Sequence, residues 1–117
     1  MVQTLARAFA LPYSTHMTTD AIIREVAKII RARLGGEYRI VLFGSQARGD
    51  ARDTSDIDIG ILGEHEVPWD TYLAIRRDVE SVRTLRHIDV VDLRSVRDAF
   101  REQALQEGKE LVAVQER

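Results

Sequence analysis

Two aspartates spaced two positions apart are the residues of this sequence best suited to chemistry. Asp56 and Asp58 lie in the segment 55–62, where acids or Gly60 alternate with isoleucines as in a β-strand. Alternation puts both carboxylates on one face of the strand, about 6–7 Å apart, where they repel each other. Because carboxylate oxygens are ligands for hard cations, the pair predicts a Mg²⁺ site. A strand with a solvated acidic face is the structural alternative.

The turn before this strand has the composition of an anion-binding loop. Gly44 and Ser45 follow an apolar strand and open a short helical segment, so their backbone N–H groups are free to hold a phosphate. Gly44 lets a phosphate approach the backbone closely, and the Ser45 hydroxyl adds a donor. Arg48, one turn further along, either contacts a phosphate or braces the loop against Asp50 or Asp53.

These residues need a scaffold, and the hydrophobic periodicity of the chain predicts one. The expected elements are a helix over 19–34, a strand over 38–43, a turn with a short helical segment over 44–49, a strand over 55–62, a helix from Pro68 to about Arg86, a strand over 87–93, a helix capped by Ser95 and ended by Gly108, and a short edge strand over 111–114. This order predicts an α/β (α+β) domain, a small mixed β-sheet with helices packed on one face.

Composition narrows the setting of this domain. The chain has 117 residues with a formal charge of −2, which suits one domain and argues against direct binding of nucleic acid. It has no cysteine and no apolar run of about 20 residues, so we expect a cytoplasmic protein without a membrane span. Residues 1–17 show weak periodicity and are expected to form an N-terminal extension to a single domain over 18–117.

A longer pattern joins the two motifs. Gly44-Ser45, ten further residues and then Asp56-Ile57-Asp58 form the pattern G-S-x10-D-x-D. In its strand–turn–strand context the sequence resembles the minimal nucleotidyltransferases of the DNA polymerase beta-like superfamily, from residue 19 to about residue 114. The resemblance implies the palm-like nucleotidyltransferase fold of that superfamily. It also implies that Gly44 and Ser45 hold the nucleotide triphosphate and that Asp56 and Asp58 are paired metal ligands.

The resemblance further implies a third carboxylate, on the following strand and between two apolar residues. Two acids qualify, Asp89 and Asp92, and their spacing of three puts them on opposite faces of the strand. The position in the family favours Asp89 as the base or third metal ligand. Asp92 lies close to Ser95 and is expected to belong to the cap of the next helix.

The implied chemistry is transfer of AMP from ATP, with two Mg²⁺ ions held by Asp56, Asp58 and Asp89 and with pyrophosphate released. Minimal nucleotidyltransferases that resemble this sequence are antitoxins paired with a helical HEPN-domain ribonuclease toxin. The implied acceptor is a tyrosine of that toxin, in a hetero-oligomer of the two proteins. A homodimer is left open for the chain on its own.

Two other functions stay open on the sequence. One is transfer to a small hydroxylated molecule such as an aminoglycoside, and the other is a non-catalytic antitoxin that acts by binding alone. The G-S and D-x-D motifs argue against the second of these, because a pure binding protein has no need for acids beside a phosphate loop. Trp69 and Tyr72 begin a helix as packing or rim residues, with stacking on an adenine as the minority alternative.

Overall fold

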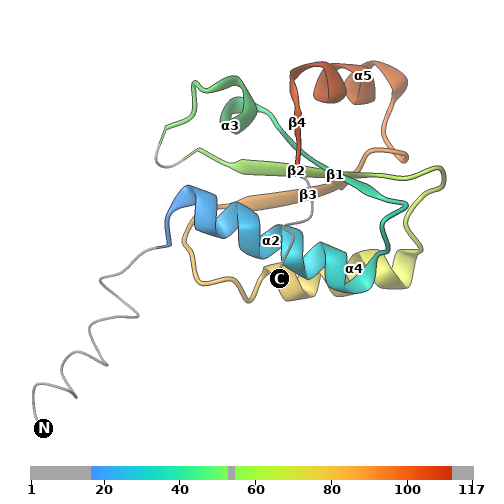
Figure 1. The fold of residues 1–117 in the computed structure, drawn as a ribbon, viewed down its shortest axis with the longest axis horizontal. Coiled ribbons are helices and arrows are strands. Elements are labelled where there is room, and N and C mark those ends of the chain that lie inside the picture. The colour runs from blue at the N-terminus through green and yellow to red at the C-terminus, as the bar shows by residue number, and fades with distance from the viewer. Residues whose placement is uncertain (1–16, 53–54, 112–117) are drawn as a thin grey trace, which may run out of the picture.

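Helices and strands alternate along residues 17–52 and 55–111, the part of the chain that the computed structural model describes (Figure 1). The elements are α2 (Thr19–Arg33), β1 (Arg39–Phe43), α3 (Ser45–Arg48), β2 (Ile57–Leu62), α4 (Trp69–Val79), β3 (Ile88–Asp92), α5 (Asp98–Glu107) and β4 (Lys109–Glu110). α2 begins where the Thr18 hydroxyl accepts a hydrogen bond from the N–H of Ala21, which satisfies one of the free donors of the first turn.

The four strands form one mixed sheet in the order β3-β2-β1-β4. β1 pairs antiparallel with β2 and with β4, while β2 pairs parallel with β3. The register places Asp58 of β2 opposite Phe43 of β1 on one side and opposite Asp89 of β3 on the other. The mixed sheet predicted from the sequence is therefore present, and β3 lies at one of its edges.

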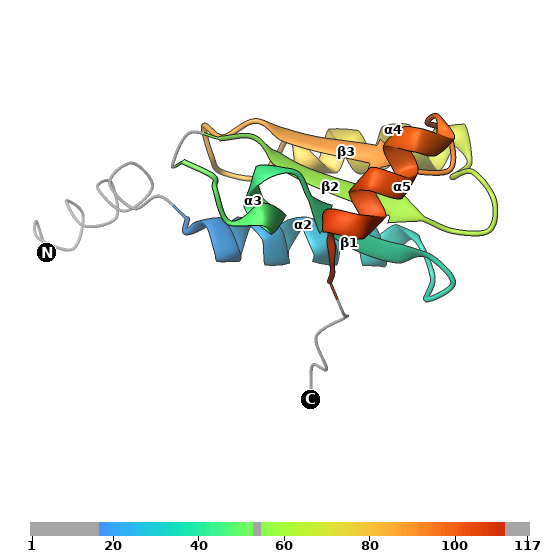
Figure 2. The same cartoon turned by 90° about the horizontal axis from the view of Figure 1, so that it is seen from above.

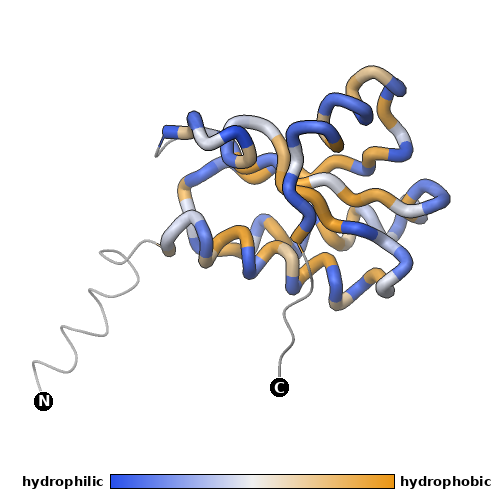
Figure 3. The backbone as a smooth tube through the Cα atoms, turned by 45° about the horizontal axis from the view of Figure 1, so that its top comes forward, coloured by the Kyte–Doolittle hydropathy of each residue, from blue (hydrophilic) through white to orange (hydrophobic). Residues whose placement is uncertain are grey.

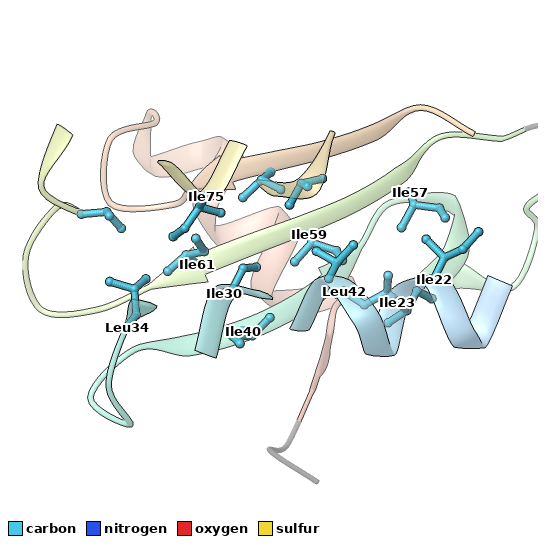
Figure 4. Packing of buried hydrophobic residues seen from close by; sticks show 14 of the residues in the cluster. Ile22, Ile23, Ile30, Leu34, Ile40, Leu42, Ile57, Ile59, Ile61 and Ile75 are labelled. Carbon is cyan, nitrogen blue, oxygen red and sulfur yellow. The ribbon is translucent and has the colours of Figure 1, made fainter. Parts of the chain in front are cut away.

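One face of the sheet is covered by α2 and α4, as Figure 1 shows. Ile57, Ile59 and Ile61 of β2 project into this layer and are each 0% exposed. Figure 4 shows these isoleucines pointing toward the apolar stripe of α2, which includes Ile22 and Ile30. The helical spacing of apolar residues in α2 and the alternation in β2 thus meet in a single core.

The opposite face carries a smaller apolar cluster, which α5 covers (Figure 2). This cluster consists of Phe43, Leu62, Leu93 and Ala104, and Ala104 belongs to α5. The sequence predicts helices on one face only, so this detail is corrected. The reason is that β1, β2 and the end of β3 present apolar side chains to both faces at this end of the sheet, and burying them requires a second layer.

Several element boundaries differ from the sequence expectation. α4 ends at Val79 rather than near Arg86, and the intervening residues form a turn. α5 begins after Arg97 rather than after Ser95, because the Ser95 hydroxyl donates to the Asp92 carboxylate (3.2 Å) instead of capping the helix.

The edge strand also lies earlier in the sequence than predicted. β4 covers only Lys109–Glu110, and the N–H of Leu111 then donates to the Ile40 carbonyl of β1 (2.7 Å). Residues 112–114 of the predicted strand lie outside the described residues, as do residues 1–16 of the predicted N-terminal extension. Met17, the last residue of that extension, packs against the main core. None of the described helices is long and apolar enough to cross a membrane.

Candidate active site

The predicted phosphate loop is a tight turn between β1 and α3. Gly44 has φ 75° and ψ −155°, a conformation that glycine adopts far more readily than other residues. The Gly44 carbonyl accepts hydrogen bonds from the N–H groups of Ala47 and Arg48, both at 3.1 Å. The N–H of Ser45, the first residue of α3, precedes these bonds and has no acceptor within so short a helix. No side chain caps the helix. In Figure 3 the segments around this turn are pale to blue, whereas the interior of the domain is mainly orange.

Gly44 also lies in direct contact with Asp58. A Cβ added at Gly44 would collide with Oδ2 of the Asp58 carboxylate. The backbone conformation therefore favours glycine at this position, and any larger residue would in addition displace the Asp58 carboxylate. The contact brings the predicted phosphate loop and the predicted acidic pair into one site.

Two further carboxylates, Asp56 and Asp89, lie near enough to Asp58 to act on its charge. Asp58 and Asp89 are partners in the parallel β2–β3 register, so they lie on the same face of neighbouring strands about 4.8 Å apart. Asp56 precedes β2 by one residue and is exposed, as is Asp89, whereas Asp58 is partly buried. Burial raises the pKa of Asp58 above its ordinary value, and the charges of Asp89 and Asp56 raise it further.

Positive groups partly offset this repulsion. His87 and Arg48 both favour the charged form of Asp58, but their effect on its pKa is smaller than that of burial and the two acids. The site therefore carries a net concentration of negative charge. A bound cation would relieve it.

The donor set fits Mg²⁺. Among the described residues, no group of three histidines, cysteines or acids lies close enough to form a complete metal site. Mg²⁺ does not need one, because it is usually held by one or two carboxylates and completes its shell with phosphate oxygens and water. Asp58 and Asp89, with Asp56 beside them, supply oxygen donors of this kind next to the Gly44 turn.

Arg48 braces α3 in the structure. Its guanidinium donates to Asp50 (3.3 Å) and to Glu107 at the end of α5 (3.3 Å), and these two hydrogen bonds raise its pKa. Bracing against Asp50 is one of the two roles predicted for Arg48, and Asp53 lies outside the described residues. Arg48 also lines a cavity of about 190 Å³ beside Gly44, so contact with a phosphate stays a prediction.

Asp92 has a structural role at the end of β3. It is 9% exposed and accepts hydrogen bonds from the N–H of Val67 (2.7 Å), the N–H of Arg94 (3.0 Å) and the hydroxyl of Ser95 (3.2 Å). It lies on the core face of β3, opposite to the face of Asp89. The choice of Asp89 over Asp92 agrees with this geometry, but Asp92 caps the turn after β3 and not helix α5.

Arg86 has a positioning role that the sequence does not indicate. Its guanidinium donates to the carbonyl of Ser55 (3.1 and 2.8 Å) and to the hydroxyl of Thr19 (2.9 Å). Next to it, the His87 carbonyl accepts from the N–H of Ile57 (2.9 Å). These bonds hold the start of β2, where Asp56 lies. No local pattern signals them, because the partners are about 30 and nearly 70 residues away in the chain.

A groove of about 620 Å³ runs along the outer edge of β3, and we call it the β3 groove. Its lining includes Trp69, Tyr72, Arg76, Asp89, Val91 and Ser95. Asp89 therefore faces both Asp58 and this groove. The rings of Trp69 and Tyr72 stack on each other, with their centres 5.7 Å apart. The sequence did not predict this contact.

The fold and the carboxylate face together define a class of protein, the nucleotidyltransferases. A family model described as Polymerase beta, Nucleotidyltransferase matches residues 38–117, and the chain belongs to this family. The match covers the Gly44 turn, Asp56, Asp58 and all of β3. The family and the fold implied by the G-S-x10-D-x-D resemblance are therefore confirmed.

Similar proteins narrow the class further. The protein adenylyltransferase MntA of Shewanella oneidensis is 28% identical over 96 residues, which are 79% of this chain and 66% of MntA. The chain thus spans slightly less than two thirds of that relative. A crystal structure of a toxin–antitoxin MntA–HpeT mutant is 28% identical with a TM-score of 0.62, over 80% of this chain and 73% of the matched chain. A toxin–antitoxin structure with AMP-PNP is 26% identical with a TM-score of 0.58, over 80% and 74%.

Proposed function

We propose that this chain is an antitoxin that transfers AMP from ATP to a tyrosine of a partner HEPN-domain toxin and so neutralises it. One observation carries the proposal, namely the Gly44 turn in contact with Asp58 while Asp89 lies in register beside it. Membership of the nucleotidyltransferase family supports the reaction class. The similarity to MntA, and to toxin–antitoxin complexes that include one with AMP-PNP, supports the nucleotide and the kind of partner.

Two Mg²⁺ ions would be held by Asp56, Asp58 and Asp89. When bound, they neutralise the triphosphate and make the acceptor hydroxyl more acidic. The raised pKa of Asp58 supports this role, because a cation stabilises the charged form of a carboxylate that burial and the neighbouring Asp89 and Asp56 disfavour. The variants Asp56→Asn and Asp58→Asn test this role, because each keeps the shape of the side chain and removes the charge of a metal ligand.

The chain's own residues divide the remaining work. The N–H groups at Gly44 and Ser45, with the Ser45 hydroxyl, bind and orient the triphosphate. Asp89 is exposed beside Asp58 and accepts the proton of the tyrosine hydroxyl. The tyrosine oxygen then bonds to the α-phosphorus, the bond from that phosphorus to the bridging oxygen breaks, and pyrophosphate leaves. Arg86 keeps Asp56 in place through the Ser55 carbonyl.

The test is a transfer assay with a HEPN-domain toxin as the candidate partner. Both proteins are incubated with α-labelled ATP and Mg²⁺, and the intact mass of each is then measured. We expect a gain of one or more AMP units on the partner, lost in Asp56→Asn and kept in Asp20→Asn, an exposed acid on α2 that serves as the matched control.

The alternatives give different results in the same assay. A stable complex without any mass gain would replace enzymatic neutralisation by binding alone. Labelling of an added aminoglycoside, with the partner unlabelled, would make the chain a small-molecule nucleotidyltransferase. The proposal also includes a cytoplasmic location. It further includes a single domain over residues 18–117, and limited proteolysis would test these domain bounds.

A further inference from the structure

The exposed Trp69 and the half-buried Tyr72 line the β3 groove together. Trp69, the first residue of α4, is 66% exposed. Its ring stacks on Tyr72 at 5.7 Å with an interplanar angle of 24°, and the guanidinium of Arg76 lies 5.9 Å from the centre of the Tyr72 ring. The Tyr72 hydroxyl donates to the carbonyl of Val90 in β3 (2.7 Å). The exposed indole is therefore fixed to the edge of the sheet before any ligand arrives.

The types of these side chains point to a protein ligand. Tryptophan, tyrosine and arginine are the residues most often found to dominate the energy of protein interfaces. A large rigid ring loses little conformational entropy when it is covered, and the stacking on Tyr72 reduces that loss further. Trp69 has little to do with the core, because it lies at the start of the helix and most of its surface is exposed.

The groove meets the candidate active site at Asp89. The phosphate turn at Gly44 lies on the β1 side of Asp58, while Asp89 and the groove lie on the β3 side. Reactants on the two sides of Asp58 would therefore approach the same carboxylates from opposite directions. ATP takes the Gly44 side in the proposed function, which leaves the groove for the acceptor.

The electrostatics and the backbone of the groove describe its occupant. Arg76 lines both the β3 groove and an adjoining hollow of about 250 Å³, which Arg86 and His87 also line. Glu80 lines this hollow as well, so two guanidinium groups face one carboxylate there, and the remaining positive charge fits an acidic side chain. The carbonyl of Val90 already accepts from Tyr72, so an added strand would not pair continuously along β3 and side chains must provide the recognition.

We propose that the β3 groove docks the segment of the partner protein that carries the acceptor tyrosine, with an apolar or aromatic side chain against Trp69 and an acidic side chain toward Arg76. This inference rests on the proposed function for the identity of the partner. It assigns Trp69 and Arg76 to selection of the acceptor and not to binding of ATP.

Trp69 is the only tryptophan in the chain, so the groove can be observed directly. The chain is prepared with fluorotryptophan, and its single fluorine resonance is followed by NMR while partner or Mg²⁺ with AMP-PNP is added. We expect the partner to shift the resonance and the nucleotide alone to leave it unchanged. A shift with nucleotide and none with partner would overturn the proposal and make Trp69 an adenine-stacking residue.

Kinetics with Trp69→Ala provides the second readout. We expect KM for the partner to rise about tenfold or more, the effect of truncating a dominant interface tryptophan, with kcat and KM for ATP unchanged. Leu73→Ala is the matched control, because Leu73 is 39% exposed on the same helix and does not line the groove. Equal effects of the two variants, or a rise in KM for ATP with Trp69→Ala, would overturn the proposal.

Binding measured without ATP separates this inference from the proposed function. Weaker binding of the partner by Trp69→Ala and by Arg76→Glu supports the groove even if no AMP is transferred by the unaltered chain, an outcome that would overturn only the enzymatic function. Unchanged binding by both variants, with AMP transfer intact in the unaltered chain, would overturn the groove and leave the function standing. Absence of any complex between chain and partner would overturn both.

Discussion

The two faces of strand β2 carry side chains with opposite requirements for burial. One face presents Ile57, Ile59 and Ile61, all 0% exposed beneath α2 and α4. The other presents Asp58, whose pKa is raised because it is partly buried near other acids. A strand alternates its side chains, so the same six residues can anchor the core and carry the candidate chemistry without compromise between neighbours. Stability and chemistry in this small domain are separated by direction rather than by distance.

The two faces of the sheet also differ in how far helices cover them. α2 and α4 cover the isoleucine face, whereas α5 covers the opposite face only around Phe43, Leu62 and Leu93. Among the described residues, neither apolar cluster includes a cover for the end of that face with Asp58 and Asp89, where burying unpaired carboxylates would cost several kcal/mol each. What remains open is the part of the sheet where a charged substrate can enter.

The largest expected effect is on the acidic face. Asp58→Asn should reduce AMP transfer by about 10³-fold, because it removes a charge that holds the cations while keeping the shape of the side chain. Steady-state transfer to the partner measures this loss, with circular dichroism to confirm the fold. Transfer at near-normal rate in this variant would remove the acidic face from the proposed mechanism.

A matched change on the isoleucine face should act on stability alone. Ile59→Ala should lower the free energy of unfolding by about 2–5 kcal/mol, as expected for a cavity in a fully buried core. Urea unfolding measures this, with Ile29→Ala, a half-buried position of α2, as the milder control. A large loss of transfer by the folded Ile59→Ala protein would contradict the separation of the two faces.

The two acids of β3 extend the comparison to the neighbouring strand. Asp89→Asn should reduce transfer by about 10²-fold with little change in stability, since Asp89 is exposed. Asp92→Asn should instead destabilise the fold by about 1–3 kcal/mol, because its buried carboxylate accepts from the N–H of Val67. Parallel thermal melts and transfer assays give both quantities, and the reverse ranking would exchange the roles of the two acids.

Gly44 and Gly49 lie at the two ends of α3, and the same substitution can be compared at both. Both have positive φ, 75° and 86°, but their ψ angles differ. Gly49 is in the left-handed helical region, where alanine costs about 1–2 kcal/mol, whereas Gly44, with ψ −155°, is in a region essentially restricted to glycine, where alanine costs up to about 3 kcal/mol. Only at Gly44 does the added Cβ also meet Asp58, since nothing lies within 4 Å of a Cβ at Gly49. Gly44→Ala should therefore weaken AMP-PNP binding about tenfold beyond any effect of Gly49→Ala. Equal affinities in a calorimetric titration would refute the close-approach argument.

The smallest effect concerns pH and the stability of the metal-free protein. A carboxyl whose pKa is raised on folding does not alter relative stability while it is protonated in both states. It destabilises the fold increasingly as pH rises above the pKa of the unfolded chain, and fully once pH exceeds the folded pKa. Without metal, Asp58→Asn should thus melt at a higher temperature than the unaltered chain at neutral pH. The difference should vanish in acid and shrink when Mg²⁺ is added. A difference in melting temperature that is constant with pH would show that folding does not raise the pKa of Asp58.

The amount that sequence reasoning could predict varies from residue to residue. Alternation alone placed Asp58 opposite the isoleucines, and the G-S-x10-D-x-D spacing led to the correct family. The preference for Asp89 over Asp92 needed the family resemblance, because both triplets look alike locally. The bonds from Arg86 to Ser55 and Thr19 could not be predicted, since they join segments far apart in the chain.

The sequence by itself therefore determined the local and periodic features of this protein. Helix α2, the isoleucine face and the glycine turn follow from backbone preferences and from the burial of apolar side chains at fixed spacing. Tertiary structure alone decided the β2–β3 register that pairs Asp58 with Asp89, the cover of the second face by α5, and the groove beside Trp69. These features arise when elements distant in sequence pack together. Their energies depend on pairs of residues that no local window contains.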